Sequence, residues 1–246
     1  PLRLDPATGV WRAALDGAGH GLPYLYLVDV YVPGAGVVRN RVTDPYALGL
    51  TADSRRSVVV DLGRPDTKPA GWDRAPRPPA PASNTDLVVY ELHVRDFSVG
   101  DATVRAPWRG RYLAFTEPAS DGVRHLRALR AAGVTDVHLL PVFDFASVPE
   151  AGCLTPPVPR AAPDAEAQQA AVDAARGRDC FNWGYDPFHY AAPEGGYATN
   201  PDDAAARARE LRAAVQALHR AGLRVGMDVV YNHTVASGQD PRSVLD

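Results

Sequence analysis

The sequence has few of the features that mark metal-binding, membrane or nucleic-acid-binding proteins. Its 246 residues include only two cysteines, and these lack the paired spacing of a zinc site. No apolar run approaches the roughly 18 to 20 residues that a membrane-spanning helix needs. The formal net charge is -3, and no basic patch is present that would neutralise phosphates. We therefore expect no metal site, no membrane partner and no nucleic-acid partner.

The two cysteines, Cys153 and Cys180, lie in one stretch rich in proline and alanine. A disulfide that closes a long loop would fit an oxidising compartment, whereas two free thiols would fit a cytosolic loop, and both interpretations stay open. The N-terminus lacks the basic and apolar regions of a signal peptide. Localisation is left open, with secretion favoured over the cytoplasm.

The composition, with 46% hydrophobic and 22% charged residues, is typical of a soluble globular protein with one or two domains. β-Branched and aromatic residues predict strands at 24–32 and 57–62, most simply as part of a β-sandwich. The proline-rich stretch 74–81 cannot sustain a helix or an interior strand and indicates a stiff linker. We therefore expect one domain with its linker at 1–82 and a second domain at 83–246.

Beyond the linker, predicted strands alternate with predicted helices. We expect strands at 87–92, 137–142 and 223–230, with a helix at 121–133 between the first two. A second helix should begin with Asn200 as its N-cap and Pro201 at its first position, and should end at Gly222. Residues 161–175 indicate a surface helix or a flexible insertion.

This order predicts an α/β fold in which crossover helices connect a parallel sheet. A (β/α)8 TIM barrel and an open doubly wound sheet both fit the order. A barrel typically needs about 250 residues, and residues 83–246 are too few for one. If the fold is a barrel, the sequence covers only its first three strands and is a fragment.

Polar residues gather where the predicted strands end, at 90–97, 182–190 and 228–233. Ligands bind at the carboxyl ends of parallel strands, so these are the candidate binding positions. The middle group combines aromatic faces, which suit a pyranose ring, with polar groups for its hydroxyls. The alternative is a local hydrophobic cluster. The aromatic residues are Trp183, Tyr185, Phe188 and Tyr190, and the polar ones are Asn182, Asp186 and His189.

Two residues of the last group invite a closer interpretation. Asp228 lies inside a predicted apolar strand, where a carboxylate needs a partner, such as an arginine from a strand outside this sequence. His233 follows five residues later. A histidine just past a strand is more often a satisfied structural residue than a ligand contact, and both roles stay open.

Two motifs resemble those of a known enzyme family. Residues 228–233, Asp-Val-Val-Tyr-Asn-His, resemble the first signature region of the α-amylase clan of glycoside hydrolases. Residues 182–187, Asn-Trp-Gly-Tyr-Asp-Pro, resemble the signature that separates type I pullulanases and plant limit dextrinases from other clan members. Further similarity covers the barrel strands at 89–98 and 133–143 and the preceding β-sandwich at 44–47 and 53–62.

The resemblance implies the first three strands of a (β/α)8 barrel after a partial β-sandwich, carbohydrate-binding-like module. It also implies retaining hydrolysis of α-1,6-glucosidic linkages in pullulan, limit dextrin and amylopectin, that is, starch and glycogen debranching. No organic cofactor is implied, and calcium in the parent protein is left open. The alternatives are an isoamylase-like or α-amylase-like clan member and a non-catalytic glucan-binding protein.

The same resemblance assigns roles to individual residues. Tyr185 would stack on the glucosyl ring at the cleavage site, and His233 would hydrogen-bond a hydroxyl of that sugar. The other expected substrate-binding residues are Asp186, Trp183 and Asn182, and the residues expected to shape the pocket are Asp228 and Asn232. The catalytic nucleophile and acid/base are expected beyond Asp246, so we expect the isolated chain to be inactive. No catalytic role is assigned to Glu91, Asp96 or Glu194.

Overall fold

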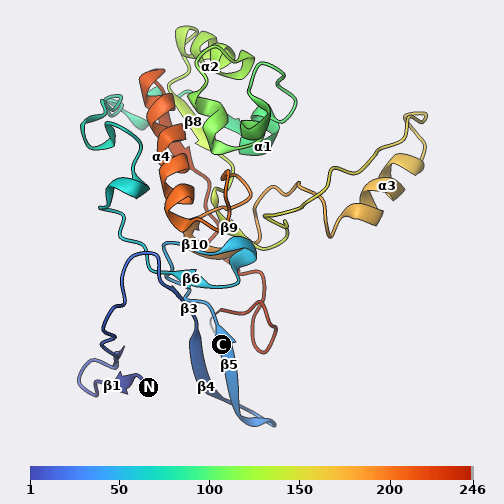
Figure 1. Ribbon diagram of the computed structural model, residues 1–246. Helices are drawn as coiled ribbons and strands as arrows, with labels where there is room; N and C mark the ends of the chain where they lie inside the picture. The colour runs from blue at the N-terminus through green and yellow to red at the C-terminus, as the bar shows by residue number, and fades with distance from the viewer. Residues whose placement is uncertain (245–246) are drawn as a thin grey trace.

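The computed structural model describes residues 1–244, and its centre is a three-stranded parallel sheet (Figure 1). β7 (Val89–Leu92) and β11 (Arg224–Met227) pair in parallel with the two sides of β8 (Asp136–Leu139). The three predicted strands are therefore confirmed, each shorter than predicted. The α/β class with a parallel sheet is also confirmed, and the sheet is open within the described residues.

Three α-helices accompany this sheet: α1 (Val94–Ser98), α2 (Asp121–Ala131) and α4 (Ala204–Arg220). α2 agrees with the predicted helix, and the Ser120 side chain caps it by accepting a hydrogen bond from the Val123 N–H. The predicted start of α4 at Asn200 and Pro201 was wrong. Asp203 is the N-cap of α4. Within residues 1–244, no helix is long and apolar enough to cross a membrane.

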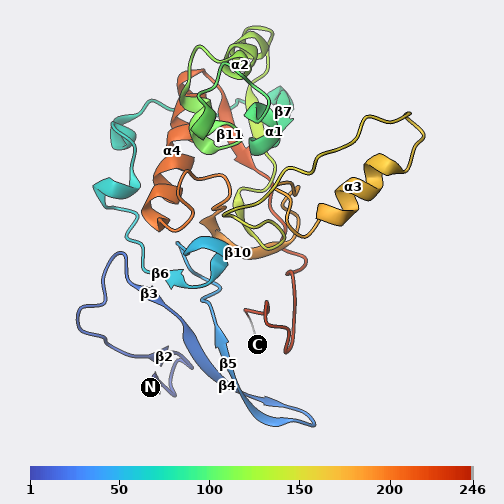
Figure 2. The same cartoon turned by 45° about the vertical axis from the view of Figure 1, so that its right-hand side comes forward.

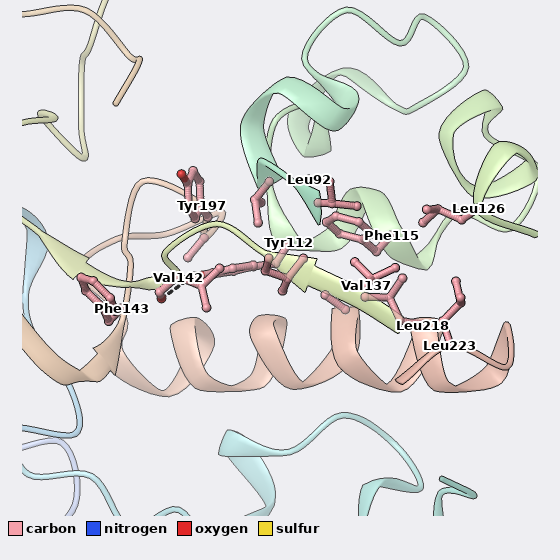
Figure 3. Close-up of a cluster of buried hydrophobic side chains, with 14 of the residues drawn as sticks. Leu92, Tyr112, Phe115, Leu126, Val137, Val142, Phe143, Tyr197, Leu218 and Leu223 are labelled. Atoms are coloured by element: carbon pink, nitrogen blue, oxygen red, sulfur yellow. Dashed lines mark hydrogen bonds between the residues drawn. The ribbon is translucent and has the colours of Figure 1, made fainter. Parts of the chain in front are cut away.

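The main core lies between the sheet, α2 and α4, where buried apolar side chains from all these elements interdigitate (Figure 3). Aromatic rings from the short 3-10 helix η6 (Tyr112–Thr116) complete one side of it. Burial of this apolar surface is the main favourable term for the fold. The labelled core residues include Leu92, Tyr112, Phe115, Leu126, Val137, Leu218 and Leu223.

The part of the chain before β7 forms three two-stranded antiparallel sheets. The pairs are β1 (Arg3–Leu4) with β2 (Trp11–Arg12), β3 (Pro23–Tyr24) with β6 (Ser57–Val58), and β4 (Tyr26–Val32) with β5 (Gly36–Val42). The hairpin of β4 and β5 projects from the body in both views (Figure 2). The strand predicted at 24–32 is confirmed as β3 and β4, and the one at 57–62 shrinks to β6.

Residues 43–60 pack against the α/β part rather than standing apart from it. Ala47 and Leu50 form one small buried cluster with Ala192, and Val58 and Val60 form another with Ala204 of α4. The remaining 3-10 helices are η1 (Ala52–Ser54), η2 (Pro65–Thr67), η3 (Trp72–Arg74), η4 (Asn84–Asp86) and η5 (Ala106–Trp108). The division into domains at residue 82 stays a prediction.

The long segment between β8 and α4 contains structure that the sequence did not predict. β9 (Phe143–Phe145) and β10 (Pro187–Pro193) pair antiparallel. Between them the chain makes an excursion that carries α3 (Ala167–Ala175) away from the body (Figure 1). A disulfide between Cys153 and Cys180 joins the two ends of this excursion. Of the two alternatives for the cysteines, the disulfide is the one observed, and the surface helix within 161–175 is present as α3.

Candidate functional site

Three segments of the chain meet at the carboxyl end of the parallel sheet. His93 follows β7 directly, and its Nε2 lies 2.7 Å from the backbone oxygen of Asn182. The Tyr185 hydroxyl lies 2.5 Å from an Asp228 carboxylate oxygen just past β11. His233 Nε2 lies 2.8 Å from the Tyr185 carbonyl oxygen. The two groups of polar residues predicted at 182–190 and 228–233 therefore form one site.

Tyr185 is fixed at its hydroxyl while its ring stays partly accessible. The hydroxyl donates to Asp228 Oδ2, and 38% of the residue is exposed. This hydrogen bond, followed by desolvation, raises the pKa of Tyr185 to about 12. The hydroxyl therefore keeps its proton at neutral pH and remains a donor, which orients the ring.

Asp228 differs from its predicted setting. It follows Met227, the last residue of β11, and is half-buried rather than enclosed in the strand. Its backbone N–H donates to the Leu139 oxygen at 2.9 Å, and its carboxylate accepts from Tyr185. A carboxylate that is partly hydrated and bound to a hydroxyl does not require a cation. Within residues 1–244 its hydrogen-bond partner is the neutral Tyr185 hydroxyl, and the arginine expected from a strand outside this sequence stays a prediction.

His233 is exposed, and one of its ring nitrogens is already committed. A carbonyl oxygen can only accept, so the Nε2 that faces the Tyr185 oxygen carries the proton. Nδ1 is then the acceptor nitrogen and is suited to a ligand hydroxyl. Tyr190 donates its hydroxyl to the His233 carbonyl oxygen at 2.8 Å, and Asn232 is exposed beside it.

The loop that carries Tyr185 is held by its own polar side chains. Asn182 accepts from the Gly184 N–H through Oδ1 and donates to Asp186 Oδ1 through Nδ2, both at 2.8 Å. The other Asp186 oxygen accepts from the Ser147 hydroxyl. The polar groups of Asn182 and Asp186, both expected to bind substrate, are thus engaged within the protein and shape the loop.

Gly184 is needed at the turn of this loop. Its φ is +90°, in the left-handed region that favours glycine, and an added Cβ would lie 2.8 Å from the Pro141 Cβ. Any other residue here would move the loop. Pro141 follows β8 by two residues, so the position of the loop depends on the central strand.

The aromatic residues of the middle group divide into an exposed set and a packed set. Trp183 is 59% exposed and can offer a ring face to a ligand beside Tyr185. Tyr190 packs against Tyr231, with ring centroids 5.4 Å apart, so part of the group is the local aromatic cluster of the alternative interpretation. His189, which the sequence suggested as a sugar contact, is fully buried.

A buried ionic cluster that was not predicted surrounds Arg207. Arg207 of α4 is 0% exposed, and its Nη2 donates to Glu150 Oε2 at 2.5 Å. Oxygens of Asp144, Glu150 and Glu194 all lie within 4.8 Å of one another. The Arg207 guanidinium supplies the positive charge that three converging carboxylates require. A Cβ on Gly195 would collide with this guanidinium, so the cluster also depends on a glycine.

Burial dominates the protonation of this cluster. Desolvation, opposed by Arg207 and reinforced by Asp144, raises the pKa of Glu150 to about 7. Desolvation together with the charges of Glu150 and Asp144 raises the pKa of Glu194 well above its usual value. The buried Glu194 carboxyl group accepts hydrogen bonds from the backbone N–H groups of Gly196 and Phe145. These contacts indicate a structural role for Glu194.

The same cluster joins residues 43–54 to the body. Glu150 accepts from the Asp53 N–H at 2.6 Å, and Asp144 accepts from the Ser54 hydroxyl at 2.7 Å. His189 lies between Asp144 and Thr43, at 2.7 Å from each, in the manner of a catalytic acid-base relay. His189 and Asp144 are 0% exposed, so a substrate cannot reach them and their role is structural.

Several known proteins that are similar to this chain in sequence are pullulanases. No protein-family model matches the chain. Pullulanase 1, chloroplastic, from Arabidopsis thaliana is 43% identical over 257 residues, and the pullulanase of Klebsiella aerogenes is 39% identical over 289 residues. Both matches cover 100% of this chain and 26% of the relative. An isoamylase from Pseudomonas amyloderamosa is 36% identical over 62% of this chain.

The fold is similar to solved pullulanase structures. PulA from Klebsiella pneumoniae in its maltotriose complex has a TM-score of 0.92 at 37% identity, covering 100% of this chain and 31% of that chain. The chain spans 26% of the length of the curated relatives named above. Because the similarity in sequence and in structure extends over the whole chain, the chain belongs to the pullulanase family, as the counterpart of a segment of its members.

Proposed function

We propose that this chain is part of a pullulanase-type debranching enzyme that hydrolyses α-1,6-glucosidic linkages in pullulan, limit dextrin and amylopectin. In this proposal residues 83–246 form the first three strands of a (β/α)8 barrel. Residues 1–82 form part of a β-sandwich, carbohydrate-binding-like module and a linker. The order β7, β8, β11 supports the barrel, because the three parallel strands are neighbours in the sheet in the same order in which they occur along the chain.

The observation that carries the proposal is the meeting of Tyr185 and His233 at the carboxyl end of these strands. Active sites of (β/α)8 enzymes lie at that end. The exposed ring of Tyr185 can stack on the C–H face of a glucose, and His233 Nδ1 can accept a hydrogen bond from one of its hydroxyls. Trp183 would extend the aromatic surface to a neighbouring sugar. The relative solved with maltotriose supports an α-glucan oligosaccharide as ligand.

The chemical step is proposed to be retaining hydrolysis. It needs a carboxylate nucleophile and a protonated carboxyl group about 5 to 5.5 Å apart. We place both outside residues 1–246, so this segment contributes binding and orientation. The three carboxylates around Arg207 are not assigned to this step, because Asp144, Glu150 and Glu194 are all buried and a substrate cannot reach them.

The test is the digestion of pullulan by the full-length protein, with maltotriose as the expected product. Tyr185→Ala should lower kcat/KM, whereas Tyr31→Ala, which removes a 74% exposed ring from β4, should not. Other oligosaccharides would indicate an α-amylase-like enzyme. Binding without any product would indicate a glucan-binding protein, and residues 1–246 alone should show no turnover.

A further inference from the structure

His93 is buried between the end of β7 and the loop that carries Tyr185. Its side chain is 8% exposed. Nδ1 lies 3.2 Å from the Asp96 backbone nitrogen, at the first turn of α1. Nε2 lies 2.7 Å from the Asn182 backbone oxygen, 89 residues further along the chain. One imidazole therefore connects two segments of the site.

The two backbone partners determine where the imidazole proton lies. The Asp96 N–H can only donate, so Nδ1 must be the acceptor nitrogen. The Asn182 oxygen can only accept, so Nε2 must carry the proton. Both contacts are satisfied only by the neutral ring with its proton on Nε2. The two backbone contacts thus favour the tautomer that carries its proton on Nε2.

Aromatic neighbours fix the orientation of the ring. The Tyr197 ring lies edge-on to His93 with centroids 5.8 Å apart, and the Phe181 ring lies 5.6 Å away on a tilted plane. The Tyr197 hydroxyl is 3.0 Å from Nε2, and Tyr197 itself is 5% exposed. A side chain packed in this way has lost its rotamer freedom and holds its hydrogen-bond partners in place.

The contact at Asn182 reaches Tyr185 through the loop. Asn182 is the residue whose side chain binds both Gly184 and Asp186, the neighbours of Tyr185 on either side. If the Asn182 backbone shifts, both of these hydrogen bonds shift with it. The Tyr185 hydroxyl must also meet Asp228 on the far side of the site. His93 therefore holds the backbone of the loop at Asn182, whereas Asp228 holds the hydroxyl of Tyr185.

We propose that His93 is a positioning residue for glucan binding: its Nε2–H holds the Asn182 carbonyl and thereby places the Tyr185 ring. The proposal rests on the proposed function, because it assumes that Tyr185 faces the sugar. His93 itself lies behind the loop and need not touch the ligand. Its contact to the Asp96 N–H is an ordinary helix N-cap that would be present without any such role.

Two substitutions separate the positioning contact from the cap. His93→Gln places an amide N–H near the position of Nε2 and so keeps a donor for Asn182, while it loses the acceptor for Asp96. His93→Asn places an amide oxygen near the position of Nδ1 and so keeps the cap, while it cannot reach Asn182. Each variant is made in the full-length protein and assayed on pullulan and by thermal unfolding.

We expect both variants to lose stability and only one of them to lose activity. His93→Asn should lower kcat/KM about ten-fold, mainly through KM, and should lower the unfolding temperature by about 2 to 4 °C, because the buried Asn182 carbonyl loses its donor. His93→Gln should keep kcat/KM near wild type while its unfolding temperature also falls by about 2 to 4 °C, as for a lost N-cap. The proposal is overturned if His93→Asn has wild-type kcat/KM, or if His93→Gln loses as much kcat/KM as His93→Asn.

A measurement that does not depend on enzymatic activity distinguishes a failure of the positioning role of His93 from a failure of the proposed function. Hydrogen exchange at the Gly184 amide, which donates to Asn182, should be faster in His93→Asn and unchanged in His93→Gln. If the wild-type protein releases no maltotriose, the proposed function fails. Unchanged exchange at Gly184 in His93→Asn would instead overturn the positioning role, whatever the substrate.

Discussion

Replacing Arg207 with methionine is expected to loosen the joint between residues 43–60 and the α/β part. Methionine fills much of the same space but has no guanidinium. The buried carboxyl groups of Asp144, Glu150 and Glu194 would then lie together without a cation. Removing one partner of a buried ion pair costs about 3 to 5 kcal/mol. At about 2 to 4 °C per kcal/mol for a domain of this size, the unfolding temperature should fall by about 10 °C.

Differential scanning calorimetry of the full-length protein at pH 7 measures this loss. Arg209→Met is the matched control, since Arg209 lies on the same helix and its hydrogen bond within residues 1–244 is to the Asp66 carbonyl oxygen. At pH 5 the deficit of Arg207→Met should shrink, because the unpaired carboxyl groups can then take up protons. The reasoning is refuted if Arg207→Met loses no more stability than Arg209→Met at pH 7.

Three other outcomes are expected from contacts described above. Burial raises the pKa of Glu150 from 4.5 to about 7. The contribution of protonated Glu150 to the free energy of unfolding is therefore fully present below pH 4.5 and is lost as the pH rises through about 7. Calorimetry should therefore show a loss of about 3 kcal/mol over this interval, and a flat profile would contradict the assignment. Changing Cys153 and Cys180 to serine should lower the unfolding free energy by about 3 kcal/mol, because the bond restricts the unfolded chain, and an unchanged denaturation midpoint would argue against this. Tyr185→Phe keeps the ring but loses the bond to Asp228, so kcat/KM on pullulan should fall about five-fold and less than in Tyr185→Ala; equal losses would exclude stacking.

Local patterns predicted the central elements well and their ends less well. The apolar spacing that predicted α2 is a property of neighbouring residues, and so is its end near Gly133. The start of α4 was misplaced because Asn200, Asp202 and Asp203 can all act as caps. In the structure Asn200 accepts from the Asp202 N–H in a preceding turn, and Asp203 caps the helix. Such competition between adjacent caps is decided by packing of the helix, which sequence spacing does not contain.

In the site, as in the secondary structure, contacts between residues close in the sequence were predictable and contacts between distant residues mostly were not. The loop at 182–186 could be recognised because its residues are contiguous, and the meeting of its Tyr185 with His233 followed from the fold. The partners of Arg207 could not be predicted, since Glu150 is 57 residues away and Ser54 binds Asp144 across 90 residues. Burial of His189 was equally hidden, because Thr43 lies 146 residues before it.

The disulfide at the base of the α3 excursion should make the candidate site tolerant of change in that excursion. Cys153 and Cys180 hold their Cα atoms 5.0 Å apart, so whatever connects them leaves and returns at one place. Asn182 begins the Tyr185 loop only two residues after that closure. Shortening, lengthening or replacing residues 156–174 would therefore transmit little displacement to the ring that is proposed to hold the sugar. Among the described residues, this stretch is a natural position for inserting a tag or a fluorescent reporter.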